Sequence, residues 1–304
     1  MKTINLIIIS MLVAVSASSS YSEEADGWFD KARERTGHGA DDMAQWFDSF
    51  FGDQQTESDR FAETYLRVIA RSLLYQNSDS SQHLRVRGNI KLPNLSHRLE
   101  LIFEDSDAGS DQTDTVPGAG AENVRAGIKW KWFDTDAIKL DLTAHWRDSG
   151  LRPGIRFRQQ QAISQNVLFH WYHRFDFGKN GWETSTDFAF DRTLGEDRLI
   201  RWRNRIDTSI GREPAHWRTV VQYRSMQGGG VGEIGRQWFV GLSGTGSRSL
   251  SEMTKTVGFT WRRSFWRDYL WFEVEPRYIW NSEVCECNTA GIQLKAEVLL
   301  FDPD

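Results

Sequence analysis

The sequence has little of what would make it a helical membrane protein or a nucleic-acid-binding protein. After the first 20 residues it has no apolar run close to the roughly 18 residues that a membrane-spanning helix needs, and its mean hydropathy is −0.55. Its net charge is −5, and a chain without a basic excess is a poor candidate for binding nucleic acid. Low mean hydropathy does not exclude a membrane β-barrel, because every second residue of a barrel strand is polar.

Cysteine is nearly absent. The only two cysteines are Cys285 and Cys287. A disulfide across one intervening residue would close a very small, strained ring. We interpret the pair as an incidental loop feature, with a strained disulfide, a weak metal site or two free thiols as alternatives. No cysteine lies near the end of the N-terminal apolar segment, so a lipoprotein anchor is not expected.

The first 22 residues have the pattern of a secretory signal peptide. Lys2 supplies the positive charge, an apolar stretch runs from Ile4 to Val15, and a run of small Ser and Ala residues follows. We therefore expect segment 1–22 to be removed on export, and the cysteines to meet an oxidising compartment.

What the sequence does have is a recurring alternation of apolar and charged residues. Between Leu84 and Leu92, and again between Val124 and Trp132, every second residue is apolar or glycine and most of the others are Arg, Lys or Asn. A period of two indicates a β-strand with two unlike faces. Fourteen such segments are predicted, at approximately 62–76, 83–92, 96–104, 122–133, 136–147, 151–160, 166–177, 182–191, 198–210, 216–226, 235–243, 252–263, 269–280 and 289–301.

The export signal, the repeated alternation and the 14 tryptophans favour a barrel whose apolar face is outside and whose charged face is inside. A Trp-rich carbohydrate-binding sandwich is the alternative. We predict an all-β fold: a transmembrane antiparallel β-barrel of 12–14 strands over residues 59–301, followed by a short tail at 302–304. An even strand number would place both termini in the periplasm and make 105–121 the longest outside loop.

Residues 23–58 precede the barrel and differ from it in composition. Six aromatic residues stand in two groups there: Trp28 and Phe29, then Trp46, Phe47, Phe50 and Phe51. The second group has the spacing of one helical face. We predict two short amphipathic helices that dock as a periplasmic lid or enter the barrel as a plug, with a poorly ordered leader as the alternative.

Two blocks of the chain resemble known proteins. The alternation from Gly291 to Phe301 resembles the C-terminal targeting strand of Gram-negative outer-membrane barrels, apart from the three-residue tail. The blocks WFDSFFGD at 46–53, LRVR at 84–87 and KLPNLSHRL at 91–99 are similar to an uncharacterised family of proteobacterial outer-membrane proteins. This resemblance implies a barrel in the cell outer membrane, and it brings no activity with it. We expect contact with outer-membrane lipid and lipopolysaccharide, and with the barrel-assembly machinery during insertion.

The predicted inward positions carry many arginines. The candidates for lining the interior are Arg85, Arg87, Arg125, Arg156, Arg158, Arg201, Arg203 and Arg205. Buried charges need water or one another, so these residues either line a wet, anion-selective lumen or fill a closed barrel as ion pairs. A barrel of about fourteen strands is wider than the eight that side chains alone can fill, which favours water inside.

We therefore predict a restricted channel for small anionic solutes, with a plugged or partner-binding scaffold barrel as the alternative. An outer-membrane lipid hydrolase is a third reading, but the chain has no G-x-S-x-G motif and no convincing metal-ligand spacing. We expect no catalytic activity, no cofactor, no metal and no nucleic-acid partner. The sequence leaves the oligomeric state open.

Overall fold

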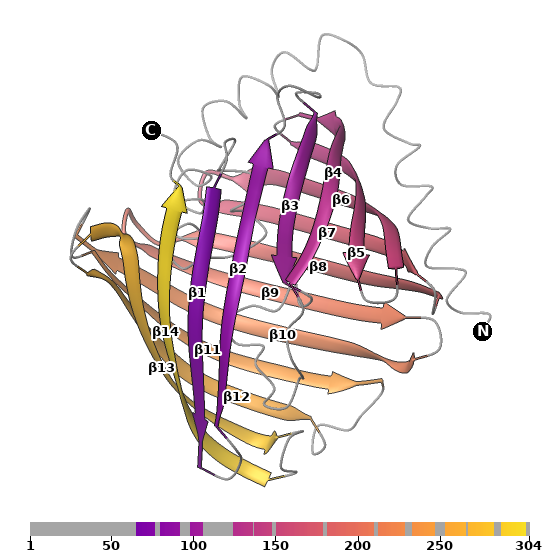
Figure 1. The fold of residues 1–304 in the computed structure, drawn as a ribbon. Coiled ribbons are helices and arrows are strands. Elements are labelled where there is room, and N and C mark those ends of the chain that lie inside the picture. Colours follow the sequence, from indigo (N-terminus) through magenta and orange to yellow (C-terminus); the bar gives the residue numbers. More distant parts are fainter. Residues whose placement is uncertain are drawn as a thin grey trace.

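The protein forms a closed antiparallel barrel of fourteen strands (Figure 1). The computed structural model describes residues 65–76, 80–91, 98–105, 124–135, 137–147, 150–178, 181–209, 212–228, 233–246, 253–265, 267–282 and 287–301. Each strand pairs with its neighbours in the chain, and the first strand pairs with the last. The strands are β1 (Tyr65–Tyr75), β2 (Ser81–Lys91), β3 (Leu99–Asp105), β4 (Val124–Asp134), β5 (Ile138–Arg147), β6 (Gly150–Ser164), β7 (Val167–Gly178), β8 (Gly181–Thr193), β9 (Arg198–Ser209), β10 (Arg212–Gln227), β11 (Ile234–Thr245), β12 (Thr254–Phe265), β13 (Arg267–Ser282) and β14 (Cys287–Phe301).

All fourteen predicted strands are confirmed, and their observed ends lie within four residues of the predicted ones. The alternative of twelve strands is wrong, because the glycine-rich stretch around residues 227–250 contains β11 as a full strand. Among the described residues no helix is long and apolar enough to cross a membrane.

The two faces of the barrel are reversed relative to a soluble protein. On β9, Arg201 and Arg203 are 3% and 6% exposed, whereas Trp202 between them is 46% exposed. On β11, Gln237 is buried and Trp238 beside it is exposed. Because a strand presents successive side chains to opposite faces, the polar set must line the interior and the apolar set the exterior. The two-layer sandwich with an apolar core is therefore wrong.

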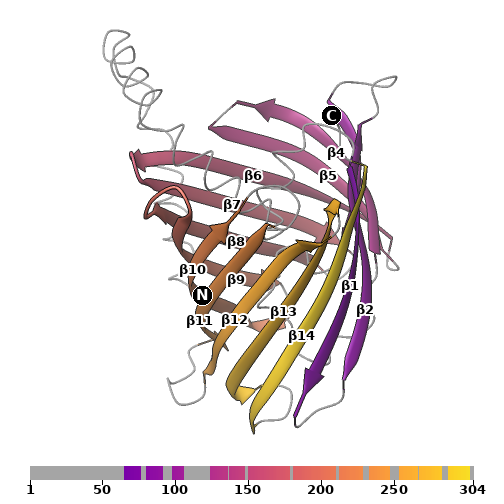
Figure 2. The same ribbon diagram turned by 90° about the vertical axis from the view of Figure 1, so that its left-hand side faces the viewer.

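Closure of the barrel brings the first and the last strand together. Figure 2 shows β13, β14, β1 and β2 side by side, and the β1–β14 ladder runs from Leu66 opposite Phe301 to Tyr75 opposite Gly291. Charged side chains of the first and the last strands thus share one stretch of inner wall. We name it the seam wall, and it consists of the inner faces of β1, β2, β12, β13 and β14.

The outward tryptophans gather toward the strand ends. At the rim where β1 begins and β14 ends, five of them each lie four positions inside their strand end: Trp130, Trp171, Trp202, Trp238 and Trp261. Several contact phenylalanines of a neighbouring strand: Phe157 and Trp171 meet edge-on with ring centroids 4.9 Å apart, and Trp238 and Phe259 meet at a tilt with centroids 4.3 Å apart. Trp146, Trp182 and Trp280 stand close to the strand ends at the opposite rim. Aromatic belts of this kind are typical of membrane–water interfaces.

Several predictions fall outside the described residues. These are the signal peptide at 1–22, the segment 23–58 with its six aromatic residues, most of the loop at 105–121, Cys285 and the tail at 302–304. Cys287 begins β14, but its side chain is not among those described, so the proposed disulfide or loop thiols stay a prediction.

Candidate functional site: the charged interior

The interior of the barrel is lined by buried charges, with basic residues in excess. Among the described residues, 14 buried side chains are Arg or Lys and 8 are Asp or Glu. They reach this position because they alternate with apolar residues along strands whose other face is apolar. Their distribution around the wall is uneven, and that unevenness decides what the interior can do.

On β9 each of the three inward arginines has a carboxylate partner. Arg201 donates to Asp191 at 2.7 Å from Nε and 2.5 Å from Nη2. Arg203 donates to both oxygens of Asp187, at 3.1 and 2.8 Å. Nearer the rim, Arg205 binds Asp207 at 2.8 and 2.9 Å. Paired, bidentate arginines of this kind are neutralised locally.

The wall from β3 to β6 is also paired. Glu100 on β3 accepts from Lys129 at 2.5 Å and Lys131 at 2.7 Å, both on β4. Asp141 on β5 accepts from Arg158 on β6 at 2.6 Å. The paired wall, meaning the inner faces of β3 to β9, therefore holds roughly as many buried acids as buried bases.

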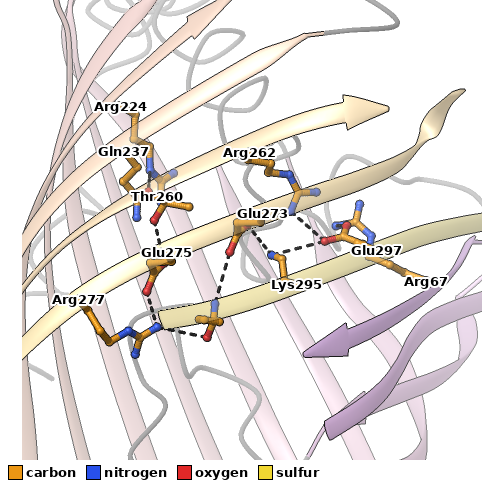
Figure 3. A network of polar contacts seen from close by, with 11 residues as sticks. Arg67, Arg224, Gln237, Thr260, Arg262, Glu273, Glu275, Arg277, Lys295 and Glu297 are labelled. Atoms are coloured by element: carbon orange, nitrogen blue, oxygen red, sulfur yellow. Dashed lines mark hydrogen bonds and ion pairs between the residues drawn. The ribbon is translucent and has the colours of Figure 1, made fainter. Parts of the chain in front are cut away.

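The seam wall carries a connected network around Glu297 and Glu273 (Figure 3). Glu297 on β14 accepts from Arg67 on β1 at 2.6 Å and from Arg262 on β12 at 3.0 Å. Glu273 on β13 accepts from Lys295 at 2.9 Å and from Arg262 at 3.3 Å. The guanidinium groups of Arg67 and Arg262 also lie over the ring of Trp271, at 5.9 and 5.5 Å from its centroid.

The network continues across the inner face toward β10. Thr260 donates to Glu275 at 2.7 Å, and Glu275 is also paired with Arg277. Arg277 reaches Gln293 at 3.2 Å, and Arg224 donates to Gln237 at 2.7 Å (Figure 3). Almost all of these side chains are fully buried, so this part of the wall is a packed polar layer.

Strands β1 and β2 add four buried arginines to the seam wall and no buried acid. These are Arg67, Arg71, Arg85 and Arg87. Of these, Arg67 is paired with Glu297 of β14, while Arg71 and Arg87 form no ion pair or hydrogen bond in the described part of the chain. The excess of basic residues therefore lies mainly on this wall.

The structure places most of the sequence-predicted arginines on the inner face, but it does not bring them together. Arg85 and Arg87 lie on β2, Arg156 and Arg158 on β6, and Arg201, Arg203 and Arg205 on β9. Arg156 lies 3.3 Å from His145. Arg125 belongs to β4, but its side chain is outside the described set.

Sequence reasoning missed several members of the seam wall: Arg67, Arg71, Arg262, Arg277 and Lys295. Arg67 and Arg71 alternate with Val68 and Ala70, so the period of two could have found them. The pairing of Arg67 with Glu297 could not have been found this way, because it depends on barrel closure.

His170 and His173 are each held by a neighbouring side chain. His170 contacts Asp191 at 3.0 Å, and the same carboxylate is bound by Arg201. His173 faces outward, where it contacts Thr186 at 2.9 Å. Within the described residues no group of three or more His, Cys, Asp or Glu side chains is arranged to hold a metal ion.

No protein-family model matches the chain, and no curated protein sequence matches it. Among solved structures, the barrel is similar to Pseudomonas putida OprB, with a TM-score of 0.49 and 7% identity over 82% of this chain and 97% of that one. It is also similar to the outer membrane protein OprD of Pseudomonas aeruginosa, with a TM-score of 0.45 and 10% identity over 78% and 92% of the two chains. A third similar structure is the NanC porin, with a TM-score of 0.43 and 7% identity over 76% of this chain and 98% of that one. These likenesses are too distant to bring a function with them.

Proposed function

We propose that this protein is an outer-membrane β-barrel that lets small anionic solutes pass. In this proposal the apolar exterior and its tryptophan belts contact lipid and lipopolysaccharide, and the chain reaches the membrane through export and the barrel-assembly machinery. The proposal includes no catalytic step, no cofactor and no nucleic-acid partner.

The observation that carries the proposal is the excess of buried basic over buried acidic side chains on the inner face, 14 against 8 among the described residues. A wall with uncompensated positive charge attracts anions and repels cations at close range. The exterior supports membrane insertion, since large apolar residues such as Trp238 and Val240 are more than half exposed there.

A second candidate function is a closed barrel that serves as a scaffold or binds a partner. It is favoured by the packing of the seam wall, where Arg262 and Glu275 have no exposed surface at all. The aromatic segment at 23–58 is the natural candidate for a plug or a partner-binding element. Aromatic density alone supports this role for Trp28, Phe29, Trp46, Phe47, Phe50 and Phe51.

Planar-bilayer recording tests the two candidates. The full mature chain is expected to give discrete conductance steps, with a reversal potential in a KCl gradient that shows preference for chloride over potassium. A variant that lacks residues 23–58 is the matched comparison. Conductance that rises on this deletion would indicate a plug, and the absence of conductance from both proteins would rule out the channel.

A further inference from the structure

Arg71 and Arg87 occupy a place in the interior where, among the described residues, buried positive charge exceeds buried negative charge. On the seam wall, seven buried side chains are basic and three are acidic among the described residues. The three acids, Glu273, Glu275 and Glu297, are all engaged by other cations of the network. Within the part of the chain that the structure describes, Arg71 and Arg87 have neither an ion pair nor a hydrogen bond.

The two arginines belong to one cluster. Arg71 lies directly across from Lys295 on β14, and Arg87 lies across from Arg67. The charges that act on the Arg71 guanidinium come from Arg87 first, and then from Glu273, Arg277 and Glu275. Arg87 and Arg277 repel the Arg71 guanidinium, whereas Glu273 and Glu275 attract it, although both acids are already bound by other cations.

Such an arrangement is costly unless an anion completes it. Arg71 and Arg87 are 5% and 7% exposed, and the Nε atom of each is buried without a hydrogen-bond partner. A buried cation is strongly unfavourable unless a partner of its own offsets its charge. A monatomic anion would offset one charge and could not accept the paired N–H bonds that each planar guanidinium directs outward.

We infer that Arg71 and Arg87, with the charge of Arg85 and Arg277 beside them, form a binding site for a doubly charged tetrahedral oxyanion, namely the phosphate group of inorganic phosphate or of a phosphate monoester. Its oxygens accept from two guanidinium forks at once, which is the geometry that arginine recognises best. Two negative charges also match the two unpaired arginines. The inference gives the proposed channel a substrate class. The site's part in transport rests on the proposed function, whereas phosphate binding itself does not.

Binding is tested by calorimetric titration of the full mature chain in detergent at pH 8, where phosphate is mostly dianionic. The probes are inorganic phosphate, glycerol phosphate and succinate, at constant ionic strength. Saturable binding of phosphate, with succinate at least tenfold weaker, is expected. Glycerol phosphate separates a site open to monoesters from one that takes only the free ion. Equal binding of succinate would overturn the assignment to phosphate.

The variant Arg71→Gln/Arg87→Gln is expected to lose phosphate binding. The matched control, Arg236→Gln/Arg263→Gln, removes the same charge from exposed arginines on the outer face and should retain it. If the double glutamine variant does not fold, Arg71→Lys/Arg87→Lys is the second test. It keeps the positive charges but removes the paired N–H donors of the guanidinium groups, so at least tenfold weaker phosphate binding is expected. Unchanged binding in either inner variant would overturn the site.

Conductance recorded from the same preparations separates this inference from the proposed function. Anion-selective conductance without phosphate binding would overturn the site and leave the channel standing. Phosphate binding without conductance would overturn the channel and leave the site standing.

Discussion

The β8–β9 part of the paired wall and the β1–β2 part of the seam wall carry similar arginine ladders with opposite electrostatics. On β9, Arg201 and Arg203 each bind an aspartate on β8, which offsets their charge. On β1 and β2, Arg71 and Arg87 face other basic residues. The same alternation of arginine and apolar residues thus produces a neutral structural wall on one side and a charged wall on the other.

The difference shows that the identity of the cross-strand neighbour decides the role of a barrel arginine. A paired buried arginine stabilises the fold through its partner and offers little charge to a solute. An unpaired one costs stability and is available for binding. The two walls should therefore respond in opposite ways when a charge is removed.

The largest expected effect comes from breaking a pair on the paired wall. Asp191→Asn removes the carboxylate that binds both Arg201 and His170, and it leaves a buried arginine uncompensated. We expect the free energy of unfolding to fall by about 3–5 kcal/mol. Guanidinium-induced unfolding in lipid vesicles measures this loss. A loss well under 1 kcal/mol would mean that the pair is not a stabilising one.

A smaller loss is expected when an arginine is placed on the other face of the same barrel. Val240 lies on the outer face of β11 and is 58% exposed. Val240→Arg should lower the free energy of unfolding in vesicles by about 2–4 kcal/mol, because the charge would enter hydrocarbon. Val240→Leu is the control and should be close to neutral. Equal stability of the arginine variant would place this face in water.

Removing the unpaired arginines should have a small effect of the opposite sign. In the absence of phosphate, Arg71→Gln/Arg87→Gln is expected to leave the free energy of unfolding unchanged or to raise it by about 1 kcal/mol, because two uncompensated buried charges disappear. The chloride-over-potassium permeability ratio should fall at the same time. The control Asp187→Asn/Arg203→Gln removes a pair whose charges cancel. If the permeability ratio fell further in this control than in the Arg71/Arg87 variant, the roles assigned to the two walls would be reversed.

The smallest expected effect comes from giving Arg71 a carboxylate partner. His83 lies directly across from Arg71 in the β1–β2 ladder. His83→Glu would place a carboxylate there and stabilise the barrel by about 0.2–1 kcal/mol, the range of a cross-strand ion pair. It should also weaken phosphate binding, measured by titration. The control is His83→Gln, which has the shape of the His83→Glu side chain without its charge and should leave phosphate binding intact.

Most of the fold could be predicted from the sequence. Alternation fixes both the presence of a strand and the face to which each residue points, so the segment around Arg201, Trp202 and Arg203 was assigned correctly from its pattern alone. The stretch before and after β11 was harder, because its glycines weaken the pattern. There the strand is maintained by the ladders to β10 and β12, which are tertiary features.

Much less of the candidate site could be predicted. The period of two shows that Arg87 and Arg203 point inward, but it does not show that one lies beside Arg67 and the other binds Asp187. Such neighbours depend on register and on which strands meet at closure. The seam wall combines residues from the first and the last strands, so local pattern can show that they point inward but not which of them meet.

The β1–β14 ladder also has a consequence for how the barrel can be completed. Arg67 is made early in synthesis and Glu297 among the last residues, so their charges can cancel only when the final strand joins the first. A slip of that ladder by a single residue would turn Lys295 and Glu297 toward the outer face and separate Arg67 from Glu297. A barrel misaligned at this ladder would therefore expose charged side chains on its apolar outer face, which is unfavourable in hydrocarbon.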